Sequence, residues 1–171
     1  MKTYLIAAAP SYIQLRKTMP DFALFRNKED ALYPQHAEEF VQMCKPFKTL
    51  KCFLHQDYIL AAKLQAQGVH LTSKQFADIQ KAKALDLEVV ISTHTHKEVL
   101  KAQELGADYV TYGPIFETPD KGEPKGVDDL ADIVQKAEVK IFALGGIITK
   151  KHVAAIEKAQ PYGFASIRYF I

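Results

Sequence analysis

Three groups of residues in this sequence could carry chemistry, and the first group suits an anion. Gly145 and Gly146 follow an apolar run, and paired glycines let backbone N–H groups approach a phosphate closely. The last apolar run holds the small residues Gly163, Ala165 and Ser166. A tight turn that needs glycine for its backbone angles is the structural alternative. We predict that a phosphate binds at Gly145, Gly146, Ala165 and Ser166.

The second group is the stretch STHTHKE, residues 92–98. His94 and His96 form an HxH pair that could indicate a metal site. Thr95 and Glu98 have the spacing of a capping box, which places His96 in the first turn of a helix and leaves His94 alone. Because imidazoles exchange protons near neutral pH, His94 is a candidate general acid or base. From residue type and position, a hydrogen-bonded histidine at a rim is an equal alternative.

The third group is basic. The stretch GPIFETPDKGEPKG, residues 113–126, is too polar for a core, and its Pro and Gly residues suit a mobile loop. Lys121 in this loop, and also Lys125, could reach over a bound anion. Arg26 and Lys28 are two residues apart on a predicted strand, so they share one side of it. We predict that Arg26, Lys28 and Lys121 hold a second anionic group, with a solvated rim as the alternative.

These groups lie at the ends of apolar runs that alternate with segments of helical period. The predicted strands are residues 2–8, 22–27, 50–55, 68–72, 88–93, 108–116, 139–146 and 162–171. The predicted helices are residues 34–47, 58–67, 74–86, 97–106, 127–137 and 151–160. This order predicts an α/β fold, a (β/α)₈ TIM barrel that is truncated, with a short first helix and no final helix after the eighth strand. An open doubly wound sheet is the alternative.

In such a barrel the loops that follow the strands lie together at one end and carry the functional groups. The strand ends therefore place His94, the two glycines and the basic residues at one mouth. Other residues there are expected to line a substrate pocket: His70, Ser92, Gly113 and Thr118. Because apolar flank beside the first and eighth strands would lack a covering helix, we also expect a homodimer.

The composition indicates a globular protein with no affinity for nucleic acid or membranes. The chain has 171 residues, is 48% hydrophobic and carries a formal net charge of +2. It shows neither an apolar run that could span a bilayer nor a signal-peptide pattern. Cys44 and Cys52 have no zinc or CxxC spacing, which favours a reducing cytoplasm. We expect a single cytoplasmic domain over residues 1–171.

Several motifs together resemble one family. GVHL (68–71), GADYVTYGPIFET (106–118), FALGGI (142–147) and GFASI (163–167) occur in the order found in thiamin phosphate synthases and their TenI-like relatives, the thiazole tautomerases. The resemblance implies a barrel that binds a thiazole phosphate on the amides around the two glycines. In the synthases a pyrimidine diphosphate binds as well. Basic residues matching Arg26, Lys28 and Lys121 and a magnesium ion hold its pyrophosphate.

The chain departs from the synthase pattern at the magnesium site. Synthases carry an Asn-Asp pair after the third strand and an acidic residue after the fourth, where this chain has His55, Gln56 and Gln75. Thr72 and Gln75 have the spacing of a capping box instead, and Leu24 replaces a usual Gln. We therefore predict no metal and no cofactor, with Mg²⁺ relevant only if synthase activity is retained.

The resemblance leaves three functional hypotheses. TenI-like relatives isomerise a thiazole carboxylate phosphate by moving a proton, with a histidine in the position of His94, so a tautomerase is favoured over a synthase. A binder or sensor of phosphorylated thiamin precursors that performs no catalysis is the alternative. A different phosphate-binding barrel enzyme is the third hypothesis. Each predicts a small phosphorylated molecule as the ligand.

Overall fold

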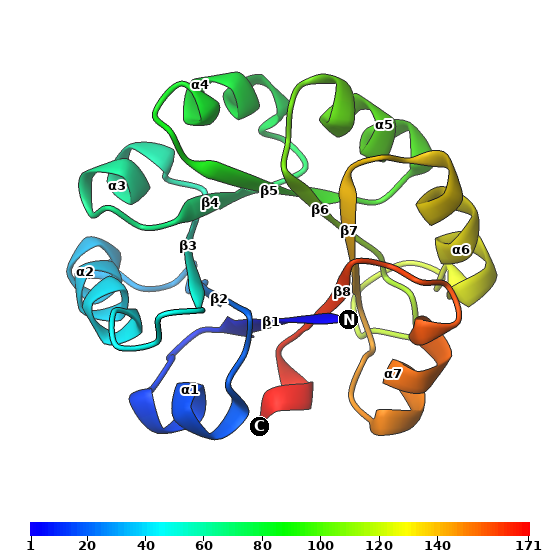
Figure 1. Ribbon diagram of the computed structural model, residues 1–171, viewed down its shortest axis with the longest axis horizontal. Helices are drawn as coiled ribbons and strands as arrows, with labels where there is room; N and C mark the ends of the chain where they lie inside the picture. The colour runs from blue at the N-terminus through cyan, green and yellow to red at the C-terminus, as the bar shows by residue number, and fades with distance from the viewer.

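The computed structural model describes residues 1–171 and shows eight parallel strands closed into a barrel (Figure 1). Each strand pairs with the next, and β8 closes the ring by pairing with β1. The strands are β1 (Lys2–Ala7), β2 (Phe22–Phe25), β3 (Lys51–His55), β4 (Gly68–Leu71), β5 (Glu88–Thr93), β6 (Tyr109–Tyr112), β7 (Lys140–Leu144) and β8 (Gly163–Ser166). The predicted (β/α)₈ barrel is confirmed, and an open sheet is excluded.

Seven helices surround the barrel (Figure 1). They are α1 (Tyr12–Thr18), α2 (Tyr33–Cys44), α3 (Tyr58–Lys63), α4 (Ile79–Lys83), α5 (His96–Glu104), α6 (Gly126–Lys136) and α7 (Lys150–Glu157). Two 3₁₀ turns, η1 (Phe76–Asp78) and η2 (Arg168–Phe170), complete the fold. The first helix is short, as predicted, and no helix is long and apolar enough to cross a membrane.

Two predicted boundaries on either side of the barrel mouth are wrong. β6 ends at Tyr112 rather than at residue 116, because Pro114 has no N–H to continue a strand ladder. The segment predicted as one helix over residues 74–86 is the turn η1 followed by the short helix α4. Both differences lengthen the loops at the carboxyl ends of the strands.

The eighth strand is also shorter than the predicted 162–171. It ends at Ser166, and the chain then turns back through η2. The ring of Phe170 stacks on that of Phe164 with centroids 6.0 Å apart, so this turn covers part of the outer face of β8. Packing of this aromatic pair explains why an apolar tail forms a turn rather than a longer strand.

Alternate side chains along the strands fill the barrel interior. This inner cluster consists of Tyr4, Ile6, Phe22, Leu24, Phe53, Val90, Tyr109, Phe142 and Ala165. Two glycines make room for the large rings. A Cβ atom at Gly68 would lie 2.5 Å from Phe53 Cε1, and one at Gly163 would lie 2.7 Å from Phe142 Cε1. The packed centre separates the two ends of the barrel, so it forms the floor of any site at the mouth.

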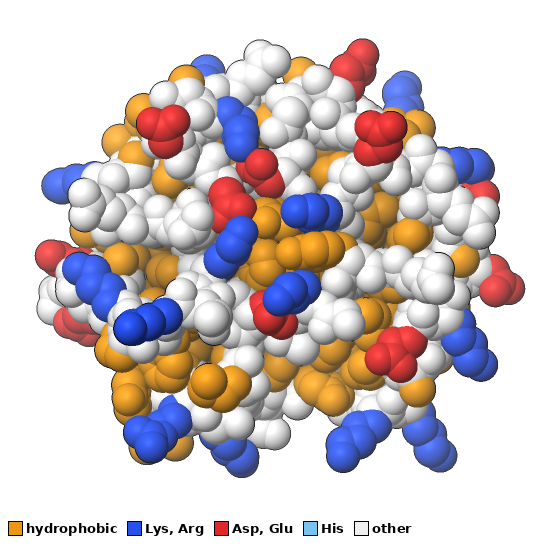
Figure 2. Space-filling model, viewed as in Figure 1, with side chains coloured by type: hydrophobic (Ala, Val, Ile, Leu, Met, Phe, Trp, Pro, Cys, Tyr) orange, Lys and Arg blue, Asp and Glu red, His pale blue; other side chains and the backbone are white.

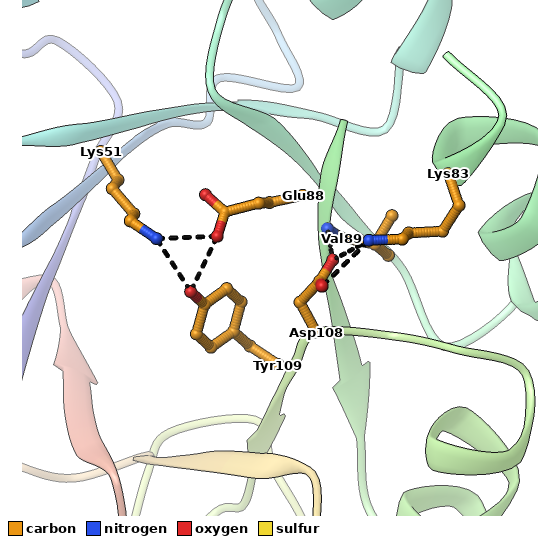
Figure 3. A network of polar contacts seen from close by, with 6 residues as sticks. All are labelled: Lys51, Lys83, Glu88, Val89, Asp108 and Tyr109. Carbon is orange, nitrogen blue, oxygen red and sulfur yellow. Dashed lines mark hydrogen bonds and ion pairs between the residues drawn. The ribbon is translucent and has the colours of Figure 1, made fainter. Parts of the chain in front are cut away.

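Charged groups close the end of the barrel where the strands begin. Lys51 Nζ donates to Glu88 Oε1 at 2.7 Å and to the Tyr109 hydroxyl at 3.1 Å, and that hydroxyl donates to the same Glu88 oxygen (Figure 3). Beside this triangle, Lys83 pairs with Asp108 at 2.8 Å. In Figure 2, basic and acidic side chains surround apolar atoms at the middle of the barrel. These contacts are structural and lie opposite the mouth.

The Glu88 network predicts a pH-dependent stability. Burial raises the pKa of Glu88, but hydrogen bonds from Lys51 and Tyr109 outweigh it and lower the pKa below its ordinary value. A carboxyl whose pKa is lower in the folded state stabilises the protein above its unfolded pKa and loses this effect as pH falls. We expect Glu88→Gln to reduce the free energy of unfolding by about 1 kcal/mol at neutral pH. Urea unfolding of both proteins measures it.

The difference between wild type and Glu88→Gln should shrink as pH falls below the ordinary Glu pKa of about 4.3. The matched control is Glu104→Gln on the exposed end of α5, which should change little at either pH. A difference that stays constant across this pH range would contradict the prediction.

Exposed apolar side chains occur near both ends of the chain. Ile13 in α1 and Met19 at the end of that helix are 78% and 65% exposed, and Ile171 is 87% exposed. The C-terminal turn lies between α1 and α7 (Figure 1). The homodimer stays a prediction that this surface motivates. Light scattering at micromolar concentration should give the mass of a dimer, and Ile13→Asp should shift it towards a monomer. A wild-type monomer would contradict it.

Candidate active site

A cavity of about 690 Å³ opens at the carboxyl ends of the strands. Every candidate site residue predicted from the sequence lines it: His94, Gly145, Gly146, Ala165, Ser166, Arg26, Lys28, Lys121, His70, Ser92, Gly113 and Thr118. These residues come from loops and strand ends along the whole chain, and closure of the barrel brings them together. Their individual roles stay predictions.

The glycine pair after β7 forms a sharp turn with free N–H groups. Gly145 and Gly146 have φ angles of 105° and 67°, in the left-handed region that favours glycine. Neither N–H donates to a backbone acceptor within the protein, whereas Gly145 O accepts from Phe116 N at 3.1 Å. Two unpaired N–H groups lining a cavity can bind an anion such as phosphate.

Ser166 has a more limited role than its residue type suggests. Its hydroxyl donates to the Ile147 carbonyl oxygen at 2.7 Å and accepts from Tyr169 N at 3.1 Å. Ser166 is buried, and so is Ala165. The serine hydroxyl therefore ties the turn after β7 to the end of β8. A ligand contact at Ala165 or Ser166 stays a prediction.

His94 follows β5 and has one ring nitrogen occupied. Its Nδ1 lies 3.1 Å from the Gly113 carbonyl oxygen. Because a carbonyl oxygen can only accept, Nδ1 must carry the hydrogen, and Nε2 has a free lone pair in the neutral ring. An imidazole oriented in this way can take up a proton at Nε2. The hydrogen bond to Gly113 O holds the ring at the rim of the cavity, and it also fixes the tautomer in which Nε2 can accept a proton.

His96 points elsewhere, as the capping box predicts. Thr95 is the N-cap of α5, and its hydroxyl accepts from Glu98 N at 3.1 Å. The His96 ring lies against Tyr112, and its Nε2 is 3.1 Å from Asp129 Oδ1 on α6. The HxH pair does not converge on one point, so it is not a metal-binding pair.

His70 forms part of the polar floor of the cavity. Its Nδ1 lies 2.9 Å from the Tyr4 hydroxyl and its Nε2 lies 3.1 Å from Ser92 Oγ. Burial lowers the pKa of His70 to about 3, with smaller contributions from His55 and Arg26, so its ring is neutral near pH 7. With both nitrogens engaged, His70 orients the Ser92 hydroxyl at the cavity wall.

The charge lining the cavity is entirely positive. Arg26, Lys28, Lys74, Lys121 and Arg168 line it, and no Asp or Glu side chain does. Burial, together with the positive charges of Arg26 and Lys28, lowers the pKa of His55 to about 4. The cavity is therefore suited to an anionic ligand.

The amides that replace the expected carboxylates have different positions. Gln56 lines the cavity, whereas Gln75 holds the turn after β4. Gln75 Oε1 accepts from Thr72 N at 3.0 Å, and its Nε2 donates to the Gln56 carbonyl oxygen and to Asp78 Oδ2, both at 3.2 Å. Half of the predicted capping box is present, but Thr72 precedes a turn rather than an α-helix.

These residues do not fit a magnesium ion. The nearest acids in sequence are occupied: Asp57 caps α3 by accepting from Leu60 N at 2.8 Å, and Asp78 pairs with Lys81. No group of three or more His, Cys, Asp or Glu side chains could hold a metal ion. Mg²⁺ prefers carboxylate oxygens, and the cavity presents none.

The lid loop, residues 113–125, borders the cavity and is anchored at both ends. Ile115 N donates to Leu144 O at 2.9 Å, and Lys125 N donates to Pro114 O at 2.9 Å. Lys121 lines the cavity, but Lys125 lies over the Tyr112 ring, 5.4 Å from its centroid. Of the two lysines that could reach an anion, the structure therefore favours Lys121.

Lys121→Ala should weaken binding of pyrophosphate more than binding of thiazole phosphate. Lys121 is a side-chain cation of the lid loop and is not one of the glycines whose N–H groups are proposed to bind the phosphate, and each direct charge contact contributes roughly threefold to tenfold. Calorimetric titration of both ligands measures the two losses. Lys125→Ala in the same loop is the matched control and should change neither. Equal losses for both ligands in Lys121→Ala would show that the lid assignment is wrong.

Sequence reasoning missed two features of the cavity. Lys74 lines it from the turn after β4, and its position directly after the strand-end residues Thr72 and Ser73 could have indicated this. The cavity also has an apolar wall, formed by Ile6, Leu24, Leu144, Ile147, Ile148, Ala165 and Ile167.

The family of the chain follows from comparison with known proteins. Residues 3–170 match the TMP-TENI family, described as thiamine monophosphate synthase. The chain belongs to this family. A thiamine-phosphate synthase of Synechococcus sp. is 34% identical over 127 residues, 71% of this chain and 35% of that protein. That of Bacillus licheniformis is 33% identical over 127 residues, 71% of this chain and 56% of that protein. The chain thus spans only part of both synthases.

A solved structure shares the fold of this chain. The thiamine phosphate pyrophosphorylase from Pyrococcus furiosus superposes with a TM-score of 0.84 over 97% of this chain and 85% of that chain, at 24% identity. At this identity the likeness shows the fold alone. The family match and the closed barrel agree with each other.

Proposed function

We propose that the protein is a thiazole tautomerase that isomerises a thiazole carboxylate phosphate. The observation that carries this proposal is the pairing of His94 Nδ1 with the Gly113 carbonyl oxygen, which leaves Nε2 as a base at the cavity. An isomerisation by proton transfer needs a positioned base and no metal. His94 is the candidate base at the cavity, and no carboxylate lines the cavity that could hold a metal ion.

The reaction would begin with removal of a proton from one carbon of the substrate by His94 Nε2. The electron pair of that C–H bond moves into the conjugated ring system, and the double bond shifts. The His94 imidazolium, held by its Nδ1–H contact to Gly113 O, then returns the proton to a second carbon. The net change is an isomerisation, with no oxidant, reductant or co-substrate.

Binding would orient the substrate across the cavity. Its phosphate would accept from the free N–H groups of Gly145 and Gly146, and its carboxylate would meet Arg26 or Lys28. The ring would lie on the apolar wall between them, close to the Ser92 hydroxyl that His70 orients. Both cysteines are free and buried, which supports the proposal that the protein works in the cytoplasm.

Thiamine phosphate synthesis is the second candidate, because the relatives carry that name. That reaction must stabilise negative charge on a departing pyrophosphate, usually with a metal ion. With Gln56 at the cavity and no lining carboxylate, we expect magnesium-dependent coupling to be weak or absent.

Two assays on the purified protein test the proposal. One follows isomerisation of thiazole carboxylate phosphate, and the other follows coupling of a pyrimidine diphosphate with thiazole phosphate. We expect activity in the first assay. Brisk magnesium-dependent coupling without isomerisation would favour the synthase. If neither assay detects activity and thiazole phosphate still binds, the result would favour a binder or sensor that performs no catalysis.

A further inference from the structure

Thr111 on β6 carries a buried hydroxyl that has no hydrogen-bond partner within the protein. The residue is only 1% exposed. The other two buried hydroxyls at the cavity are paired: Thr93 Oγ1 donates to Thr111 O at 2.8 Å, and Ser166 Oγ donates to Ile147 O at 2.7 Å. Because an unpaired buried hydroxyl costs free energy, the Thr111 hydroxyl is a candidate for a bond that forms only with a ligand.

The Thr111 side chain points into the barrel. Side chains alternate between the two faces of a strand, and Tyr109, two residues earlier on β6, belongs to the inner cluster. The residues on either side of Thr111, Val110 and Tyr112, belong instead to the larger cluster beneath the helices. Thr111 therefore lies one layer nearer the mouth than Tyr109, where it lines the cavity.

The side chains beside Thr111 do not satisfy its hydroxyl. In the strand register Thr111 pairs with Ser92 on β5 and with Phe142 on β7. Phe142 has no polar side-chain atom, and Ser92 Oγ contacts His70 Nε2 at 3.1 Å instead. The Tyr4 hydroxyl contacts the other ring nitrogen of His70 at 2.9 Å. This polar chain is complete without Thr111, so the Thr111 hydroxyl remains for a group that enters the cavity.

The sites proposed for the charged groups of the substrate leave its ring for Thr111. The phosphate is assigned to the Gly145–Gly146 turn after β7, and the carboxylate to Arg26 or Lys28 after β2. In the closed barrel, β6 lies next to β7 and four strands from β2, so its inward side chains face a ring held between these two positions. Of the two heteroatoms in a thiazole ring, nitrogen accepts a hydrogen bond better than sulfur.

We propose that the Thr111 hydroxyl is a specificity-determining group that donates a hydrogen bond to the ring nitrogen of the substrate. The inference deepens the proposed function and rests on it for the identity of the ring. Because neighbouring atoms cover the Thr111 oxygen, the bond requires a small rotation of the threonine side chain. A phosphorylated ring without an acceptor nitrogen would leave the hydroxyl unpaired, so the site would select against it.

Thr111→Val tests whether the hydroxyl is unpaired before a ligand binds. Valine has a similar shape and no polar atom, so the loss of an unpaired hydroxyl should raise the Tm by about 2–4 °C. Thr93→Val is the matched control, because it removes a hydroxyl that donates to Thr111 O, and it should lower the Tm. Thermal unfolding without ligand measures both. A Tm for Thr111→Val that is equal to or below that of wild type would overturn the proposal.

Calorimetric titration with two ligands tests the bond to the ring nitrogen. One ligand is thiazole phosphate, and the other is its thiophene analogue, in which a C–H group replaces the nitrogen. Wild type should bind thiazole phosphate roughly threefold to tenfold more tightly than the analogue. Thr111→Val should lose this preference, and Thr111→Ser, which keeps the hydroxyl, should retain it. A preference that persists in Thr111→Val, or that is absent from wild type, would overturn the proposal.

Failure of this inference is distinguishable from failure of the proposed function. A preference that depends on Thr111 in a protein without isomerase activity would support the inference and reject the tautomerase. Isomerase activity in a protein that binds both ligands equally would support the tautomerase and reject the role of Thr111. A wild-type protein that binds neither ligand would reject both.

Discussion

His94→Asn should lower the rate of thiazole carboxylate phosphate isomerisation by about 10²-fold or more, because it removes the nitrogen proposed to transfer the proton. Asn keeps a polar group near the Gly113 carbonyl oxygen that His94 Nδ1 contacts, so the loop should change little. The effect should appear in kcat rather than in thiazole phosphate binding. Steady-state kinetics and calorimetric titration of the same preparation measure both.

His96→Asn is the matched control, since it alters the other histidine of the HxH pair. His96 contacts Asp129 and Tyr112 instead of the cavity, so its loss should leave the isomerisation rate within a few-fold of wild type. Thermal unfolding of both variants checks that each is folded. Equal rates for His94→Asn and wild type would show that another group performs the proton transfer.

Gly146→Ala should weaken thiazole phosphate binding by on the order of 10²-fold. The φ angle of Gly146 is 67°, and a Cβ atom there would lie 2.6 Å from the Glu117 carbonyl oxygen and 2.7 Å from Phe116 Cβ. Either the lid loop or the glycine turn must shift to relieve this contact. A shifted turn misaligns the two N–H groups proposed to bind phosphate. Calorimetric titration with thiazole phosphate measures the loss.

Gly122→Ala is the matched control in the lid loop itself. A Cβ atom at Gly122 would meet nothing within 4 Å, so the same chemical change should leave phosphate affinity close to wild type. Comparing the phosphate affinities of Gly146→Ala and Gly122→Ala separates the effect of a distorted glycine turn from any general effect of a glycine-to-alanine change. Similar affinities for both variants would place the phosphate elsewhere.

The barrel and the position of its mouth could be predicted from the sequence. Continuous apolar runs alternating with helical segments indicate parallel strands covered by helices, and eight such units favour a barrel over an open sheet. Parallel strands also bring their carboxyl ends to one side, so the sequence predicts that residues as distant as Arg26 and Ser166 line one cavity, and both do. The local capping signal of Thr95 likewise separated His94 from His96.

Element ends and side-chain partners were decided by tertiary contacts. Stacking of Phe170 on Phe164 turned a predicted strand into a turn. The Ser166 hydroxyl could have faced a ligand, but the turn after β7 brings the Ile147 carbonyl oxygen within 2.7 Å of it. Local sequence patterns carry no information about contacts between segments distant along the chain, and these contacts set hydrogen-bond partners.

The sequence by itself determined the alternation of strands and helices, and it carries the amides Gln56 and Gln75 where the family resemblance predicts carboxylates, because these follow from residue type and order. Only the tertiary structure decided which side-chain groups line the barrel mouth and which of their atoms are already hydrogen-bonded. It showed which nitrogen of His94 is free, by bringing Gly113 O to Nδ1. It also showed that Lys74 lines the cavity, whereas Lys125 lies over the Tyr112 ring. Lysine side chains carry the same charge, so only their surroundings distinguish a lysine that lines the cavity from one that does not.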